Sequence, residues 1–105
     1  MCIENNIKKT FEIIKEINYK RDNSIISKEE VEEEEENINE LPEIINKFNT
    51  VLEKLDKIKG RENSELLSQL IQLHLAIGDI EWQYDQLHEI VRNAIQSIEV
   101  ESDEI

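Results

Sequence analysis

The residues of this sequence best suited to hold a metal are its two histidines, His74 and His88, with the acids near them. The histidines are 14 residues apart, which is about 21 Å along one helix, so they cannot share an ion. Asp85 precedes His88 by three residues, and a carboxylate-x-x-His spacing is used by di-iron helical bundles. Such a site needs two of these motifs and further inward glutamates, and only one motif is present. We therefore predict no bound metal and no cofactor.

The glutamate run Glu32 to Glu36 is a second group of carboxylates. It could attract Ca²⁺ or a basic partner, but a run of like charges is typical of a solvated face. The sequence has no glycine-rich phosphate loop, zinc-ligand spacing or Ser-His-Asp set. Its single cysteine, Cys2, cannot form an internal disulfide, which fits a reducing compartment. We predict no catalytic residue and no enzyme activity.

One short motif indicates an alternative. The stretch AIGDIEW, from Ala76 to Trp82, resembles the second acidic motif of all-α nucleotide pyrophosphohydrolases of the MazG type. That family binds Mg²⁺ through Glu-x-x-Glu and a later Glu-x-x-Asp. Asp79 matches the last position, whereas Ala76 stands where the family has glutamate, and Glu30 with Glu33 provides an upstream Glu-x-x-Glu. The resemblance implies a Mg²⁺-dependent hydrolase of nucleotides.

Composition indicates a single all-α domain. The chain has 105 residues, of which 38% are hydrophobic and 35% charged, with two glycines and one proline. This length supports one modest core, and so few turn residues argue against a β fold. No apolar run approaches the ~18 residues of a membrane span, and the N-terminus lacks the order of a signal peptide. We expect a soluble intracellular protein, cytoplasmic or nuclear, without membrane contact.

Charge alternates in sign along the chain, whose net charge is −13. Residues 1–21 and 44–61 are net basic, whereas residues 22–43 and 62–105 each contain ten acids and one base. Oppositely charged neighbouring segments favour one register, although an exposed pair contributes only ~0–1 kcal/mol. The acidic surplus argues against direct nucleic-acid binding. It would permit a further alternative, an acidic decoy or inhibitor of a nucleic-acid-binding protein.

The first half of the chain contains two helix signals. Residues 1–21 are predicted to form an amphipathic helix, with an apolar face of Ile3, Ile7, Phe11, Ile14 and Ile17. Residues 22–38 are an acidic linker or a helix extension, in which Ser27 and Glu30 form a capping box and Ile26 and Val31 a hydrophobic staple. Pro42 leaves two possibilities: a new helix capped by Asn39, or one kinked helix over residues 28–59.

Residues 39–98 are predicted to form an antiparallel helical hairpin. Gly60 is the expected left-handed stop, Asn63 or Ser64 the next cap, and residues 99–105 an acidic tail. The short loop favours antiparallel neighbours. Folding about residues 61–62 pairs Leu55 with Ser68, Phe48 with Leu75, Leu41 with Trp82 and, in a continuous helix, Val31 with Arg92.

The last helix carries an apolar seam with 4-3 spacing over about four and a half heptads, which is typical of coiled-coil packing. Its members are Leu66, Leu70, Leu73, Ile77, Ile80, Tyr84, Leu87, Val91, Ala94 and Ile98. Further apolar residues lie off this seam and indicate a second neighbour: Ile71, Leu75, Trp82, Ile90 and Ile95. For Trp82 two interpretations stay open, burial against the first helix or an anchor for a partner.

These patterns predict a three-helix bundle or a coiled-coil-like assembly. Beyond Trp82 the seam would face only the glutamate run, which offers little apolar area, so residues 80–98 are the predicted association surface. The predicted partner-binding residues are Trp82, Tyr84, Leu87, Val91 and Ile98. In pattern and composition the chain looks like short helical-hairpin subunits of eukaryotic scaffolds such as Mediator or kinetochore complexes. We therefore predict a non-catalytic adaptor or small subunit that binds a protein partner or a second copy of itself.

Overall fold

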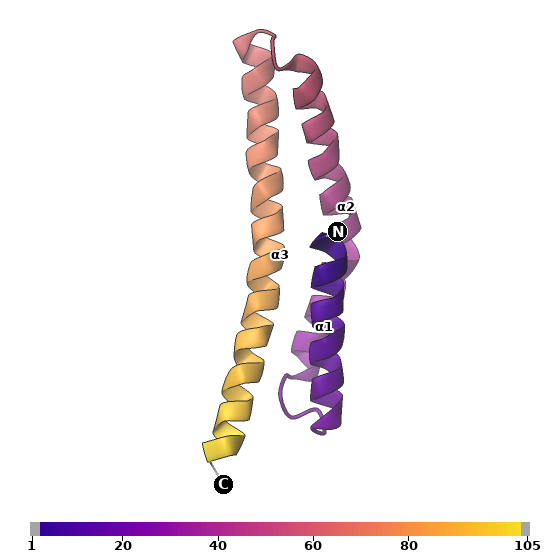
Figure 1. The fold of residues 1–105 in the computed structure, drawn as a ribbon, viewed down its shortest axis with the longest axis vertical. Helices are drawn as coiled ribbons and strands as arrows, with labels where there is room; N and C mark the ends of the chain where they lie inside the picture. Colours follow the sequence, from indigo (N-terminus) through magenta and orange to yellow (C-terminus); the bar gives the residue numbers. More distant parts are fainter. Residues whose placement is uncertain (1–2, 104–105) are drawn as a thin grey trace.

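The chain folds into three helices. The computed structural model describes residues 3–103, of which 89% are helical and none is in a strand. The helices are α1 (Ile3–Lys20), α2 (Lys28–Ile58) and α3 (Asn63–Asp103) (Figure 1). Helices α2 and α3 form an antiparallel hairpin, and α1 packs against both of them. The prediction of an all-α three-helix bundle is confirmed.

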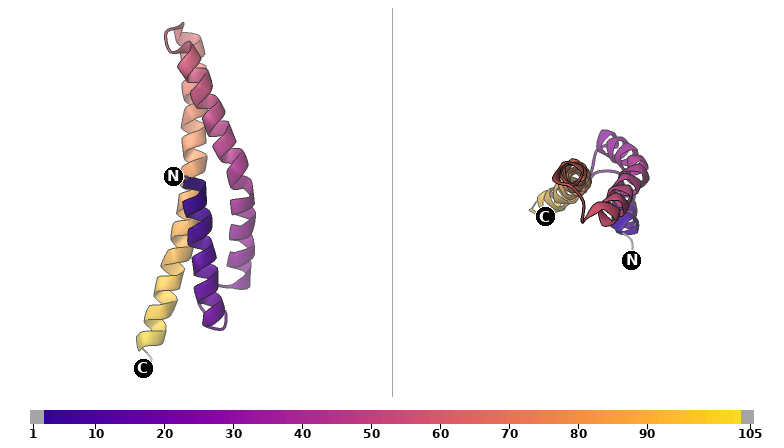
Figure 2. Two further views of the ribbon diagram at one scale, coloured as in Figure 1. Left: turned by 45° about the vertical axis from the view of Figure 1, so that its right-hand side comes forward. Right: turned by 90° about the horizontal axis from the view of Figure 1, so that it is seen from above.

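The molecule is elongated, with extents of 65 × 24 × 20 Å. Because α1 has 18 residues and α3 has 41, α1 lies beside only one half of the hairpin, the lower half in Figures 1 and 2. We call this the proximal half. The distal half, residues 44–58 of α2 and 63–79 of α3, ends at the loop between these helices. Of the helices in residues 3–103, α2 and α3 extend into it and α1 does not.

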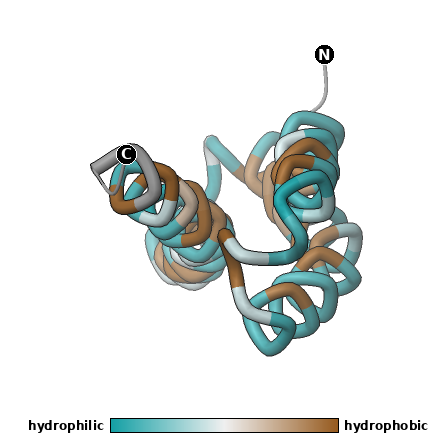
Figure 3. Tube along the Cα trace, turned by 90° about the horizontal axis from the view of Figure 1, so that it is seen from below, coloured by the Kyte–Doolittle hydropathy of each residue, from teal (hydrophilic) through white to brown (hydrophobic). Residues whose placement is uncertain are grey.

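The hydrophobic core lies in the proximal half. Viewed from below, the three helices occupy the corners of a triangle (Figure 3). The buried cluster between them comprises Ile7, Phe11, Ile25, Ile26, Leu41, Leu87, Ile90 and Ala94. Leu41 has no exposed surface, and Ile25 and Ile26 belong to the connection between α1 and α2 rather than to a helix. The connection therefore forms part of the core.

A buried asparagine holds that connection in place. The Asn18 side chain is 4% exposed, and its Oδ1 accepts hydrogen bonds from the backbone amides of Ile25 at 2.9 Å and Ile26 at 3.1 Å. Asp22 and Asn23 turn the chain with φ of 57° and 59°, a region that Asp and Asn tolerate better than most residues. The asparagine thus fixes the two isoleucines over the core.

Replacement of Asn18 by alanine is expected to destabilise the bundle substantially. The substitution leaves two buried amides without an acceptor, and a buried unsatisfied group costs about 1–3 kcal/mol. Urea unfolding followed by circular dichroism measures the change. Asn5→Ala, at an exposed position of the same helix, is the control and should change the free energy of unfolding by less than ~0.5 kcal/mol. Equal stability of the two variants would contradict the role of Asn18.

Helix α2 begins at the predicted capping box. Ser27 is its N-cap, and its Oγ accepts a hydrogen bond from the Glu30 amide at 3.1 Å. The Ser27 hydroxyl is also 3.3 Å from the Glu30 carboxylate, to which it can donate. The helix continues through Pro42, so the single-helix alternative is the one observed, and no new helix starts after Asn39. Proline has no N–H to donate to the Ile38 carbonyl, and the two parts of α2 are inclined to each other in Figure 2.

The turn between α2 and α3 differs from its prediction. Gly60 is not left-handed, because no described glycine has a positive φ, and Lys59 caps α2 in a right-handed conformation. The Glu62 carbonyl accepts the first helical bond of α3 from the Leu66 amide at 3.2 Å. Glu62 therefore holds the cap position that was predicted for Asn63 or Ser64. At its other end α3 continues to Asp103, so residues 99–103 extend the helix beyond the predicted boundary at Ile98.

The predicted hairpin register is confirmed by three bonds between α2 or its N-terminal connection and α3. Folding about residues 61–62 places residue 30 opposite residue 93, and the Asn93 Nδ2 donates to the Glu30 carboxylate at 3.0 Å. The other two bonds run from Gln83 Nε2 to the Asn37 carbonyl at 2.7 Å and from Ser97 Oγ to the Ile25 carbonyl at 2.9 Å. The short loop thus fixed the pairing over the whole hairpin.

The seam of α3 that faces α2 is rotated from the predicted one. Ala76 and Gln83 are 6% and 0% exposed, whereas the predicted members Leu70, Ile77 and Tyr84 are 40–51% exposed. Ala76, Gln83 and Ile90 are spaced by seven residues and form one line of this contact. The prediction chose the larger apolar residues next to this line. The predicted members Leu66, Leu73, Ile80, Leu87 and Ala94 are buried or half-buried as expected, but beside them the contact uses a small residue and a polar one, so Leu70, Ile77 and Tyr84 remain outside.

Candidate protein-interaction site

The structure separates the five predicted partner-binding residues into two groups. Leu87 is 7% exposed and belongs to the core, Ile98 packs against that core, and Val91 is half-buried. Trp82 and Tyr84 are 44% and 43% exposed, so Trp82 is not buried against α1. The predicted surface over residues 80–98 therefore needs correction. Its apolar side is covered by α1 and by the α1–α2 connection, a cover that the sequence patterns did not reveal.

Exposed apolar side chains gather in the distal half instead. From residue 66 to residue 78 the sequence contains no Asp, Glu, Lys or Arg. Five large apolar residues of this stretch are 40–61% exposed, and Leu52 of α2 is 45% exposed. We call these six residues the distal apolar face: Leu52, Leu67, Leu70, Ile71, Leu75 and Ile77. Single exposed apolar residues are common, but a cluster of this kind is typical of an interaction site.

The arrangement of this stretch explains its exposure. Ala76 faces α2, and Leu67 and Ile71, which are one helical turn apart, lie on the opposite side of α3. A helix that is apolar on nearly all sides is normally surrounded by neighbours. Among the described helices, α2 is the one that lies beside α3 in the distal half, because α1 does not extend that far. The side of α3 away from α2 is left uncovered.

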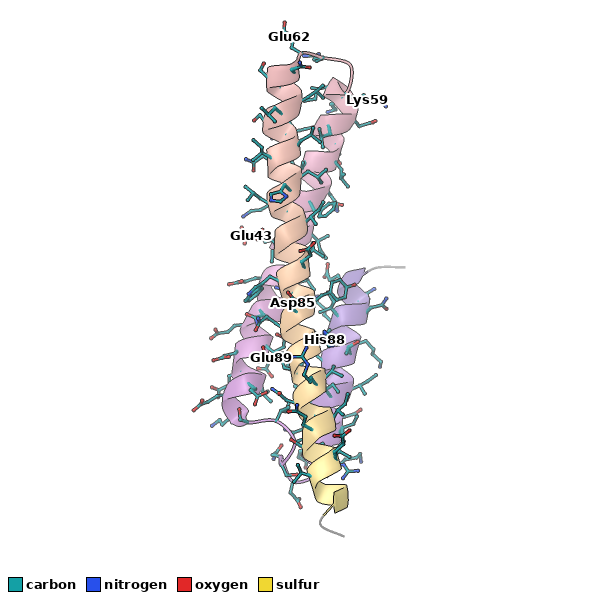
Figure 4. The ribbon with its side chains drawn as sticks, turned by 90° about the vertical axis from the view of Figure 1, so that its left-hand side faces the viewer. Glu43, Lys59, Glu62, Asp85, His88 and Glu89 are labelled. Carbon is teal, nitrogen blue, oxygen red and sulfur yellow. The ribbon has the colours of Figure 1, made fainter. Side chains whose placement is uncertain are left out.

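Charged residues border the distal apolar face at both ends. At the loop end the five residues 57–61 contain three bases and no acid: Lys57, Lys59 and Arg61. At the other end, residues 79–89 contain four acids and no Lys or Arg: Asp79, Glu81, Asp85 and Glu89. Figure 4 shows these two ends of α3, with Lys59 by the loop and Asp85 and Glu89 beside the proximal half. Acids lie at the loop end as well: Lys59 is paired with Asp56 at 2.8 Å and Arg61 with Glu65 at 4.0 Å, and Glu62 is adjacent, so the loop end has no net charge and the other end is acidic.

A polar groove lies between α2 and α3 in the proximal half, with a volume of about 290 Å³. Its lining is Glu30, Glu33, Glu34, Asn37, Gln86, Glu89, Ile90 and Asn93. Glu34 is 1% exposed; its Oε1 accepts from Asn37 Nδ2 at 3.0 Å, while its Oε2 has no hydrogen-bond partner. Burial raises the pKa of the Glu34 carboxyl, and the hydrogen bond from Asn37 opposes that effect.

The sequence patterns did not predict this buried glutamate, because a run of like charges indicates a solvated face. A signal was nevertheless present, since Glu34 occupies the 3-4-3 line of Val31, Ile38 and Leu41. The other acids of the run are exposed. One of them, Glu35, lies 3.4 Å from the Lys15 ammonium of α1. This pair joins a basic segment to an acidic one, as the charge alternation indicated.

Glu34→Gln is expected to stabilise the protein at neutral pH. The unfolded carboxyl ionises near its usual pKa of 4.5, whereas the folded one keeps its proton to higher pH because its pKa is raised. The free energy of unfolding therefore falls as pH rises from the pKa of the unfolded carboxyl to the raised pKa of the folded one. A neutral amide avoids this loss. Thermal unfolding between acid and neutral pH measures it. The advantage of the variant should shrink as pH falls, and exceed that of Glu32→Gln, which removes an exposed charge of the same run. Equal effects at all pH values would count against a buried, raised-pKa Glu34.

The candidate metal and nucleotide residues are not brought together. Asp85 and His88 are exposed, and residues 3–103 contain no group of three His, Cys, Asp or Glu side chains arranged for a metal. Glu30 bonds Asn93, which is about 21 Å along α3 from Asp79, and Asp79 instead borders a groove with Lys47. The MazG-like positions thus do not form one site. Cys2 lies outside the described residues.

Comparison with known proteins adds no relative. No family model matches the chain, and neither a curated protein nor a solved structure is significantly similar to it. Within residues 3–103, no helix combines the length and the apolar character that crossing a membrane requires. The fold and the site define an elongated three-helix bundle with an uncovered helical hairpin, and the functional argument depends on that geometry.

Proposed function

We propose that this protein is a non-catalytic helical interaction protein, an adaptor or small subunit that packs its distal apolar face against helices of another polypeptide. The observation that carries the proposal is the six half-exposed apolar residues of the two-helix distal half. Covering a leucine or isoleucine completely is worth ~1.5–3 kcal/mol. A partner that supplied the missing helices would gain part of this for each residue.

Coiled-coil-like packing suits this surface. Leu67, Ile71 and Leu75 recur every four residues on the side of α3 away from α2, which is how an amphipathic partner helix is contacted. Trp82 extends the same side toward the proximal half and is 44% exposed. Tryptophan is enriched among residues that dominate binding energy. The interpretation of Trp82 as a partner anchor therefore remains part of the proposal, as does Tyr84.

A pair of matched double variants tests the function. Leu67→Glu with Ile71→Glu adds two charges to the distal apolar face, and Ser68→Glu with Gln72→Glu adds two charges at the same spacing on exposed polar positions of the same helix. We expect the first variant to weaken association at least tenfold, which corresponds to about 1.4 kcal/mol, and the second to retain it.

The measurement is chemical cross-linking of the tagged full chain in cell extract, followed by mass spectrometry of every joined chain, including further copies of the protein itself. Circular dichroism should give the same helix content for both variants and the wild type. If all three proteins join the same chains in equal yield, the distal apolar face is not an interaction site.

A further inference from the structure

We propose that the polar groove between α2 and α3 in the proximal half binds a primary alkylammonium cation, the group carried by small polyamines and by lysine side chains. The ammonium would lie against the free carboxylate oxygen of Glu34, and its carbon chain would lie on Ile90. This site is separate from the distal apolar face, and the inference does not depend on the proposed function.

The groove is closed at both ends by hydrogen bonds between α2 and α3. At one end Asn93 Nδ2 donates to the Glu30 carboxylate at 3.0 Å, and at the other Gln83 Nε2 donates to the Asn37 carbonyl at 2.7 Å. Glu30 and Asn37 are seven residues apart, which is about 10 Å along α2. The volume of about 290 Å³ suits a small ligand. The chain's own bonds therefore preform a short groove.

Glu34 is the residue that points to a ligand. Its side chain lines the groove and is 1% exposed; Oε1 accepts from Asn37, whereas Oε2 has no hydrogen-bond partner. A second buried acceptor without a partner is the Oε1 of Gln83, a residue with no exposed surface. Buried acceptors of this kind are uncommon and call for a bound water, an ion or another donor. A ligand with several N–H donors would supply what the lining lacks.

The charge of the lining favours a cation. It contains no basic side chain and four carboxyl groups, those of Glu30, Glu33, Glu34 and Glu89. Within the described part of the chain, no ion pair involves Glu33, Glu34 or Glu89. Lys28 and Arg92, which are close to this lining in sequence, are exposed and do not belong to it. Figure 4 shows Glu89 on the part of α3 that lies beside the first half of α2.

The geometry selects an alkylammonium among the possible cations. A Mg²⁺ or Ca²⁺ ion needs several oxygens around one point, and residues 3–103 contain no such group of three acidic, Cys or His side chains. A guanidinium prefers both oxygens of a carboxylate, but Asn37 already occupies one oxygen of Glu34. An ammonium is compact and has three donors, so a single free oxygen suffices. Ile90, which is 6% exposed, offers an apolar contact to the adjoining methylene groups.

Isothermal titration calorimetry with 1,4-diaminobutane at physiological ionic strength tests the site. We expect saturable binding at one site per chain. Glu34→Gln should weaken it by about tenfold or more, because hydrogen bonds between charged groups are the strong ones. Glu32→Gln removes the same charge from an exposed position of the same helix and should keep the affinity within about threefold.

Unfolding would not explain a loss of binding, since Glu34→Gln is expected to be more stable than the wild type at neutral pH. Circular dichroism of both variants checks this. Equal affinities of the Glu34→Gln and Glu32→Gln proteins, or a wild-type chain that does not bind the diamine, would overturn the inference.

Matched ligands test the chemistry. Tetramethylammonium carries a positive charge but no N–H to donate, so it should not displace the diamine, and neither should Mg²⁺ at the same concentration. Displacement by either would indicate a general attraction for cations and overturn the ammonium site. An acetyl-Gly-Lys-Gly-amide peptide distinguishes the sources of the group. Tighter binding of the peptide would indicate a lysine of another polypeptide, and tighter binding of the diamine a free amine.

Nuclear magnetic resonance locates the ligand. The side-chain amide signals of Asn37, Gln86 and Asn93, which line the groove, should shift with the affinity that calorimetry gives. The signal of Asn5, an exposed residue of α1, should not. Equal shifts at all of these positions would show diffuse screening of the acidic surface and would contradict a site in the groove.

Discussion

The double variant Leu87→Asp, Val91→Asp is expected to be unfolded under conditions in which Trp82→Asp, Tyr84→Asp keeps its helix content. The sequence placed all four residues on one association surface. In the structure Leu87 is 7% exposed and belongs to the core with Ile90 and Ala94, whereas Trp82 and Tyr84 are 44% and 43% exposed. The two pairs therefore distinguish core from surface within one helix.

The size of the effect follows from the environment of Leu87. Replacing a buried leucine with a short side chain costs about 2–5 kcal/mol, and burying an unpaired carboxylate costs several kcal/mol more. A domain of this size has ~5–15 kcal/mol of stability in total. Among the residues that the structure describes, no basic side chain is buried and could pair with a new aspartate. The combined loss is therefore comparable to the whole stability of the bundle.

Far-ultraviolet circular dichroism and urea titration give the result directly. The first variant should lose cooperative unfolding, while the second should keep it with a smaller change in free energy. A folded Leu87→Asp, Val91→Asp protein would place these residues outside the core and return them to the association surface predicted from sequence. Unfolding of the Trp82→Asp, Tyr84→Asp protein would show that the two aromatic residues hold the fold.

The overall architecture was predictable because local signals are strong in this chain. Scarce glycine and proline indicated helices, the capping box marked the start of α2, and the short loop at residues 59–62 set the hairpin register. These features act within a few residues of each other, so a single sequence is enough to reveal them. Pro42 left two possibilities open, since proline is compatible with both a helix start and an interior kink.

Which side of α3 faces α2 was less predictable. The stretch from residue 66 to residue 77 has apolar residues on nearly every side, so periodicity alone could not select the line of Ala76 and Gln83 over that of Ile77 and Tyr84. Glutamine in a core is likewise not expected from its polarity. Its Nε2 is satisfied by the Asn37 carbonyl of α2, a partner that becomes visible only once the helices are in register.

The sequence also did not reveal that the α1–α2 connection covers the proximal half of the hairpin. Ile25 and Ile26 lie next to a turn-forming segment, and their burial depends on bonds from their amides to Asn18, seven and eight residues earlier. With this cover in place, residues 80–98 have less apolar surface to offer than predicted. The abundance of apolar residues in α3 made its seam ambiguous. Because α1 does not extend to the distal half, several of these residues stay exposed there, and the candidate site lies in that half.

Leu41→Ala is expected to have the second largest effect on stability. Leu41 has no exposed surface and is the α2 residue of the buried cluster, which it shares with buried residues of α1 and α3. Removing its branched end leaves a cavity at a point where three helices converge and cannot easily close. Leucine-to-alanine changes at such sites lower the free energy of unfolding by about 2–5 kcal/mol. For a chain of this length each kcal/mol corresponds to a midpoint shift of roughly 4–8 °C.

Ile95→Ala is the matched control, because Ile95 lies in the same proximal half, lies off the seam of α3 and is 51% exposed. Its loss should cost less than ~1 kcal/mol. Both variants are best made in the Leu67→Glu, Ile71→Glu background, so that association through the distal apolar face does not add to stability. Thermal and urea unfolding should then give a large loss for Leu41 and a small one for Ile95. Comparable losses would mean that the three helices do not share one core at Leu41, and that α1 is not what buries the proximal half.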